Sequence, residues 1–132
     1  MTTYGLLIFD GAEELDFVGP WEVFTISAML REDAGTVVLI AERPDAGPAR
    51  GRKVATYYAF EDTLQARGDV TVVRDARYVV DGNLITSQGV SAGIDMALWL
   101  VGRIHGRDHA RAVRRHIQYE PAPPYLADEP LA

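Results

Sequence analysis

Two short apolar runs with a helical pattern between them constrain the fold of this chain more than any other feature of its sequence. The first run, Tyr4–Phe9, is closed by Asp10-Gly11, and the second, Thr36–Ala41, is rich in β-branched residues. Short apolar runs bounded by turn residues are typical of buried parallel strands. Between them, apolar residues recur at helical spacing over Gly19–Arg31, and Pro20 suits the first position of a helix. The sequence therefore predicts a right-handed βαβ unit and an α/β fold.

Shorter elements follow in the second half. The prolines and glycines between residues 42 and 52 predict a loop. Asp81-Gly82 is favoured chemistry for a tight hairpin turn and predicts a small antiparallel meander. The elements expected are strands at Val54–Phe60, Val70–Val73, Tyr78–Val80 and Leu84–Ser87, helices at Asp62–Arg67 and from Ala92 to Gly106, and a last helix capped by Asp108. With 132 residues, the chain has room for one domain, residues 1–132.

Charge and composition exclude several classes of protein. The formal net charge of −6 repels phosphate backbones, so we expect no nucleic-acid binding. The longest apolar stretch, Met96–Val101, is far too short to span a bilayer, so we expect no membrane partner and a cytoplasmic location. The chain has no cysteine, which excludes disulfides, thiolate metal sites and a cysteine nucleophile.

The segment Gly89-Val90-Ser91-Ala92-Gly93 fits the pattern G-x-S-x-G between a predicted strand and a predicted helix. This is the context of a nucleophile elbow, so Ser91 is a candidate serine nucleophile. The three histidines that could serve it all follow it, but few sets satisfy the chain order of serine, acid and histidine. In the simpler interpretation, the small residues allow a close turn and Ser91 caps the helix.

His105 and His109 are spaced by four residues, as in the zinc motif H-E-x-x-H. Gly106 interrupts the helix between them, and the motif's glutamate is missing. We therefore predict no metal site and interpret both histidines as solvated helix ends. The arginines between residues 103 and 115 are interpreted as a solvated face rather than an anion site.

Four acidic residues follow the first predicted strand: Asp10, Glu13, Glu14 and Asp16. Open α/β sheets bind ligands at the carboxyl ends of their strands. Asp16 comes just before Gly19-Pro20, so we expect it at the start of the first helix with its carboxylate facing the pocket above the sheet. There it can act as a general acid or base, or it can cap the helix, and the residues alone leave both roles open.

Three segments, in order, resemble a known family. They are Leu6–Gly11 with Leu15–Phe24, then Asp81–Leu98, then Tyr119–Tyr125. Together they are similar to the isonitrile hydratase branch of the ThiJ/PfpI superfamily, which is class I glutamine amidotransferase-like. The same module also occurs as the ligand-sensing half of AraC-type transcription regulators.

The resemblance implies a remnant of a flavodoxin-like parallel sheet with helices on both faces. It also implies an internal deletion near Asp62-Thr63, on the order of 60 residues, that removed the cysteine nucleophile. Asp16 would be the carboxylate that hydrogen-bonds this nucleophile and manages the proton as water adds to the isonitrile carbon. Glu22 and the backbone of Gly89, Val90 and Ser91 would line the same pocket.

Three hypotheses follow from these observations. In the first, the chain is a truncated isonitrile hydratase-like domain that is catalytically inert, needs no cofactor and forms a homodimer through exposed strand edges. In the second, it is a ligand-sensing domain that binds a small molecule and acts through a partner. In the third, it is a serine hydrolase that uses Ser91.

Overall fold

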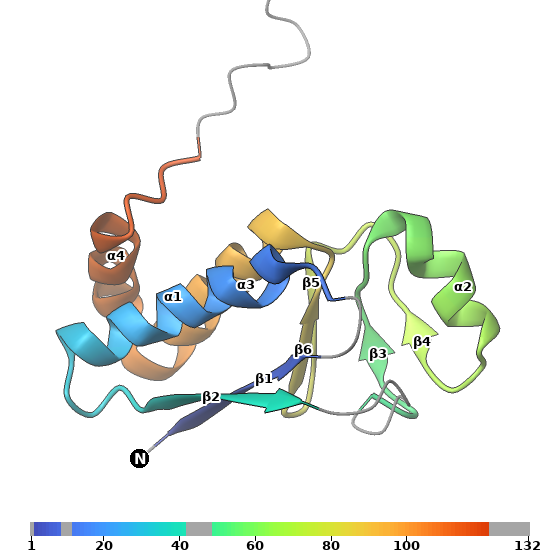
Figure 1. The fold of residues 1–132 in the computed structure, drawn as a ribbon, viewed down its shortest axis with the longest axis horizontal. Coiled ribbons are helices and arrows are strands. Elements are labelled where there is room, and N and C mark those ends of the chain that lie inside the picture. The colour runs from blue at the N-terminus through green and yellow to red at the C-terminus, as the bar shows by residue number, and fades with distance from the viewer. Residues whose placement is uncertain (1, 9–11, 42–48, 122–132) are drawn as a thin grey trace, which may run out of the picture.

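The computed structural model describes residues 2–8, 12–41 and 49–121, and these fold into a mixed α/β structure (Figure 1). The α/β class predicted from the sequence is confirmed. In chain order, the elements are β1 (Thr3–Ile8), α1 (Glu14–Leu30), β2 (Thr36–Ala41), β3 (Lys53–Val54), a 3-10 turn (Tyr58–Phe60), α2 (Glu61–Ala66), β4 (Thr71–Val72), β5 (Tyr78–Asp81), β6 (Leu84–Ser87), α3 (Val90–His105) and α4 (Arg107–His116). None of the helices in these ranges is long and apolar enough to cross a membrane.

The first three elements form the predicted βαβ unit. Strands β1 and β2 pair in parallel with Thr3 opposite Thr36 and Ile8 opposite Ala41, and α1 connects them. Strand β2 has the predicted bounds, because a run of β-branched residues ended by turn chemistry leaves little choice of boundary. The expected strand end at Phe9 and the Asp10-Gly11 turn lie outside the described residues.

Helix α1 begins five residues earlier than the sequence predicted. It starts at Glu14, so Pro20 lies inside the helix rather than at its first position, and that prediction is wrong. A proline inside a helix lacks the amide that would bond the carbonyl four residues back, which here belongs to Asp16. A Cβ added to Gly93 of α3 would lie 3.6 Å from that carbonyl oxygen, so this part of α1 faces α3. Tertiary packing therefore offsets the local cost of Pro20.

Helices α1 and α3 cross closely where both carry glycine. A Cβ on Gly93 would lie 3.2 Å from the Cγ of Pro20, and a Cβ on Gly19 would lie 2.9 Å from the Cγ1 of Ile94. Either side chain would push the helices apart. This crossing fixes the N-terminal end of α3 beside that of α1.

The main core lies between β1, α1, α3 and α4. Tyr4 stacks on Phe24 with ring centroids 4.3 Å apart, and Val113 anchors α4. Ala110 and Ile117 pack with Val113 against this cluster. Its buried members are Tyr4, Val23, Phe24, Ile26, Ala97, Val101 and Val113.

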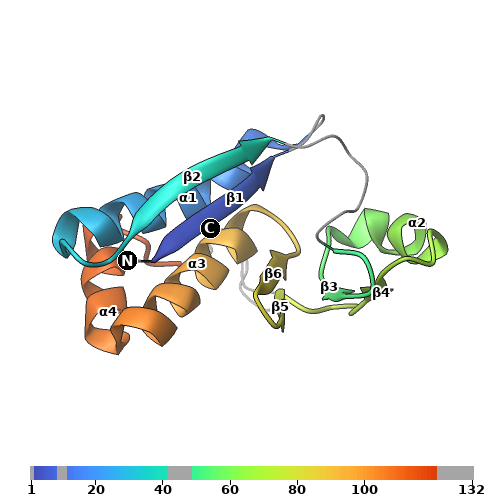
Figure 2. The same cartoon turned by 90° about the horizontal axis from the view of Figure 1, so that it is seen from below.

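The residues between 53 and 87 form two small sheets instead of one meander. Strand β4 pairs in parallel with β3, while β5 and β6 form the predicted antiparallel hairpin, which turns at Gly82-Asn83. Of the expected Val54–Phe60 strand, only Val54 belongs to β3, and Tyr58–Phe60 forms a 3-10 turn. A side-chain contact joins the two sheets: the Asp81 carboxylate of β5 accepts a hydrogen bond from the backbone amide of Lys53 in β3 at 2.8 Å. Figures 1 and 2 show α2, β3 and β4 beyond the hairpin, at the opposite end from α4.

The helices of the main core lie on one side of the β1–β2 sheet (Figures 1 and 2). On the other side, Leu7, Val38 and Ile40 are 43%, 37% and 47% exposed. Within the part of the chain that the structure describes, the expected helices on both faces are therefore present on one face of this sheet only. A parallel sheet is normally covered on both faces, so this uncovered face marks an incomplete layer.

Candidate functional site

A cavity of about 1520 Å³ separates β1 from the β3–β6 part of the chain. Its walls come from β1, the first turns of α1 and α3, the β5–β6 hairpin and the segment after β3. Three exposed aromatic side chains also line the cavity: Tyr57, Tyr58 and Phe60. Its largely apolar walls with some polar groups are typical of a ligand site, and its volume exceeds the usual range of about 300–1,000 Å³.

Asp16 lines this cavity from the first turn of α1. It is the third residue of α1, which agrees with the expected place at the start of the first helix, and it lines the cavity together with Glu13. Its side chain is exposed, yet desolvation by the surrounding protein raises the pKa of Asp16 above its usual range. Its carboxylate has no hydrogen-bond partner among the described residues. The carboxylate is therefore free to meet a ligand, while Asp10 lies outside the described residues.

Gly89, Val90 and Ser91 line the same cavity from the start of α3. Gly89 has φ 152°, in the region that favours glycine, and it takes the N-cap position. Ser91 is an exposed residue of the first turn with no capping hydrogen bond, so its predicted role as the helix cap is wrong. The cavity thus brings Asp16 and the Gly89–Ser91 segment together.

Glu22 lies apart from these residues. It is exposed on α1 and is not among the residues that line the cavity. At about 100° per residue, a six-residue step from Asp16 turns its side chain about 120° away around the helix axis. The structure therefore places Glu22 on a different side of α1.

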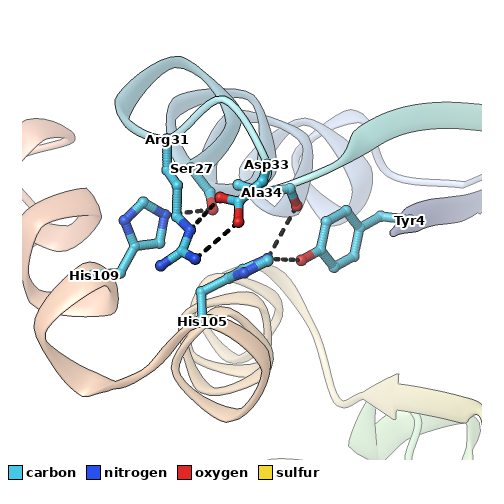
Figure 3. Close-up of polar contacts among 7 residues, drawn as sticks. All are labelled: Tyr4, Ser27, Arg31, Asp33, Ala34, His105 and His109. Atoms are coloured by element: carbon cyan, nitrogen blue, oxygen red, sulfur yellow. Dashed lines mark hydrogen bonds and ion pairs between the residues drawn. The ribbon is translucent and has the colours of Figure 1, made fainter. Parts of the chain in front are cut away.

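No hydrogen bond joins Ser91 to a histidine side chain among the described residues. His105 is fourteen residues further along α3, which is about 21 Å along a helix axis. Both His105 and His109 are held at that far end, where His105 Nε2 lies 2.8 Å from the Tyr4 hydroxyl and His109 Nε2 lies 2.9 Å from the Ser27 hydroxyl (Figure 3). The geometry gives no support to the serine hydrolase hypothesis.

The two histidines are not the solvated helix ends that the sequence predicted. Both are partly buried and hydrogen-bonded across the core, and Gly106 breaks the helix between them with φ 93°, as expected. Sequence reasoning missed these contacts because their partners lie 101 and 82 residues away along the chain. The Ser27–His109 pair is not a catalytic dyad, since Ser27 is 0% exposed and no substrate can reach it. No group of three metal-binding side chains occurs in the ranges that the structure describes.

The arginines of α4 form the solvated face that the sequence predicted. Arg107, Arg111, Arg114 and Arg115 are all exposed. Arg111 pairs with Asp108 at 3.0 Å, and Arg114 pairs with Glu120 at 3.0 Å. Such exposed pairs contribute little to stability.

Comparison with known proteins identifies relatives of this chain. Residues 33–103 match the family model described as DJ-1/PfpI family. The chain is also 41% identical over 96 residues to isonitrile hydratase from Pseudomonas putida. That match covers 73% of this chain and 40% of the length of the hydratase.

Solved structures with the same fold have lower sequence identity. A ThiJ/PfpI family protein from Pseudomonas syringae superposes with a TM-score of 0.70 and 20% identity, over 96% of this chain and 78% of that protein. An AraC family transcriptional regulator from Pseudomonas putida superposes with a TM-score of 0.71 and 10% identity, over 87% and 98%. DJ-1beta from Drosophila melanogaster gives a TM-score of 0.63 and 16% identity, over 90% and 98%. On the sequence match and the fold together, this chain belongs to the DJ-1/PfpI family.

Proposed function

We propose that this chain is an isonitrile hydratase-like ThiJ/PfpI domain that binds a small molecule in its cavity and does not hydrate isonitriles. The observation that carries the proposal is that a cavity lined by Asp16, whose carboxylate has no hydrogen-bond partner among the described residues, occurs in a chain without cysteine. Covalent attack by a thiolate is not available to a chain without cysteine, and we assign Asp16 the transfer of a proton only. Asp16 and the Gly89–Ser91 segment would then contact the ligand.

An activity assay tests this proposal. We expect an aliphatic isonitrile incubated with the purified chain to give formamide at the rate of buffer alone. The Asp16→Asn variant should match the parent, as should Glu14→Gln, a control that removes a neighbouring acid of the same helix. If the parent forms formamide and Asp16→Asn alone does not, Asp16 activates water directly and the proposal is wrong. Loss of activity in Ser91→Ala alone would instead revive the serine hydrolase hypothesis.

Ligand sensing of the AraC-regulator type remains compatible with this proposal, since it also needs a cavity and no chemistry. It predicts a second protein that the ligand-bound chain contacts. Co-purification of a DNA-binding partner would favour this alternative, and ligand binding with no partner would favour the simple binding domain. The proposal also includes a cytoplasmic location without membrane binding, which cell fractionation tests. It further includes no bound cofactor and no bound nucleic acid.

We also propose that the chain associates with itself through β1. The Thr36 amide donates to the Thr2 carbonyl at 2.9 Å, and backbone polar groups alternate between the two edges of a strand. The amides and carbonyls of Thr3, Gly5 and Leu7 therefore face the other edge, where no described strand pairs with them. Unpaired edges beside an exposed apolar face favour association.

Light scattering tests the association. We expect a dimer mass at micromolar concentration, and we expect Leu7→Lys to shift the chain toward monomer by placing a charge on the exposed apolar face beside the open edge. The control is Glu32→Lys, an exposed site away from β1. A monomer mass that does not depend on concentration would show that β1 remains unpaired in solution.

A further inference from the structure

Two imidazoles lie at the junction between α3 and α4, where they touch three other parts of the fold. His105 is the last residue of α3, and His109 lies in the first turn of α4. Figure 3 shows both rings pointing toward the end of α1 and the turn after it. Their centroids are 5.7 Å apart, with the ring planes almost perpendicular.

The hydrogen bonds of His105 fix the position of one proton. Its Nε2 atom lies 3.0 Å from the Ala34 carbonyl oxygen, which can only accept a hydrogen bond. Nε2 must therefore carry hydrogen and donate, in either charge state of the ring. The same atom contacts the Tyr4 hydroxyl, and burial raises the pKa of Tyr4, so this phenol stays neutral. His105 thus holds the end of α3 against β1 and the turn before β2.

His109 holds α4 against α1 through a different partner. Ser27 is fully buried, and its hydroxyl can either donate to the neutral ring or accept from the charged one. The hydrogen bond therefore survives protonation of His109. What changes is the charge, which would lie partly buried and close to a second imidazole.

The other charged groups near His109 do not stabilise a positive charge on its ring. Arg31, in the turn after α1, repels it, and so does His105 of α3 when that ring is charged. Asp33 attracts it, but its carboxylate is already paired with Arg31 through two hydrogen bonds, one of them at 2.9 Å. Desolvation and the neighbouring cations therefore lower the pKa of His109 below its ordinary value. β1 contributes Tyr4, which carries no charge.

Helix α4 is the element that such a charge would displace. It packs against α1 and α3, and Val113 is its one fully buried residue. Gly106, with φ 93°, ends α3 and precedes α4, so the backbone changes direction between the two helices at this residue. An element with few buried contacts opens locally at a lower free energy than the rest of a core.

We propose that His109 forms a pH-sensitive latch with Ser27, which holds α4 on α1 while the ring is neutral and releases α4 when the ring takes up a proton beside His105 and Arg31. Release exposes the core around Val113 and Val101. Tyr4, the partner of His105, also lines the cavity, but the latch needs no ligand there and so does not rest on the proposed function.

Hydrogen exchange of the parent chain at about pH 7.5 and about pH 5.5 tests the latch, because these values bracket the ordinary histidine pKa of about 6.5. After correction for intrinsic exchange rates, we expect protection of the α4 amides to fall about threefold or more at the lower pH, with β1 and the middle of α3 unchanged. His109→Gln keeps a polar group for Ser27 but cannot titrate, so its α4 protection should not depend on pH. His116→Gln removes an exposed histidine of the same helix and should behave as the parent does.

Equal α4 protection at both pH values, or the same pH response in His109→Gln as in the parent, would overturn the latch. A nuclear magnetic resonance titration of the imidazoles in the parent provides a second test that needs no variant. We expect the ring of His109 to take up its proton below the ordinary histidine pKa of about 6.5. Protonation of His109 at this pH or higher would contradict the proposal.

Discussion

Replacing Gly93 by alanine tests the close crossing of α1 and α3, which positions Asp16 relative to the Gly89–Ser91 segment. The added Cβ would lie 3.2 Å from Cγ and 3.5 Å from Cδ of the Pro20 ring, which is tied to the backbone and cannot turn aside. In a helix interior, alanine is favoured over glycine by about 1 kcal/mol. Overpacking a tight contact costs about 1–3 kcal/mol. The strain therefore exceeds the gain, and we expect Gly93→Ala to lower the free energy of unfolding by about 1 kcal/mol.

Gly102 of the same helix provides a matched control. A Cβ there would lie 3.4 Å from the Cβ of Ala110, which is an ordinary contact. Gly102→Ala should therefore keep most of the propensity gain and raise the free energy of unfolding by up to about 1 kcal/mol. For a domain of this size the two variants should differ in Tm by about 7 °C.

Urea unfolding followed by circular dichroism at a helix wavelength measures both variants. The slope of free energy against urea should be the same in both, because neither change alters the surface exposed on unfolding. If Gly93→Ala stabilises the chain as much as Gly102→Ala does, α1 and α3 do not touch at Gly93. The geometry of the site described above would then be wrong.

Three further changes test other parts of the structure. Val113→Ala removes two methyl groups from a fully buried site and should lower the free energy of unfolding, measured with urea, by about 2 kcal/mol. The control Arg115→Ala, on the exposed face of α4, should change this free energy by less than about 0.5 kcal/mol. The pKa of Asp16 is raised in the fold, so its carboxylate destabilises the folded chain at neutral pH. Asp16→Asn should therefore raise the free energy of unfolding at pH 7, and the difference should disappear below the ordinary pKa of 3.8. Equal stability of the two proteins at pH 7 would count against desolvation of Asp16. The pKa of His109 is lowered in the fold, so the unfolded chain binds a proton at a higher pH than the folded chain does. The free energy of unfolding should therefore fall as the pH drops through 6.5 toward the lower pKa of the folded chain. If His109→Gln shows the same dependence of this free energy on pH, another group titrates.

The βαβ unit could be predicted from the sequence because its signals are local. Strand β2 follows from a run of β-branched residues, and the hairpin follows from the turn chemistry of Asp81-Gly82, although the two turn residues are Gly82 and Asn83. The start of α1 could not be predicted in this way. Pro20 favours a helix start locally, but α3 packs against that turn and the helix extends back to Glu14.

The candidate site shows the same division. Asp16 and the Gly89–Ser91 segment were recognised from motifs, and the structure places both on one cavity. The pairing of Val54 with Val72 depends on a strand that follows seventeen residues later, so local propensity extended β3 to Phe60 wrongly. The histidine contacts depend on residues in the first quarter of the chain, which no local pattern relates to α3 and α4.

The most direct test of the central claim follows an isonitrile labelled with ¹³C at its terminal carbon by nuclear magnetic resonance. Isonitrile hydratase from Pseudomonas putida, which is 41% identical to this chain over 96 residues, serves as the positive control. We predict that the formamide carbon signal grows with the control and stays at the buffer level with this chain. A formamide signal that grows with the concentration of this chain and disappears in Asp16→Asn would contradict the account.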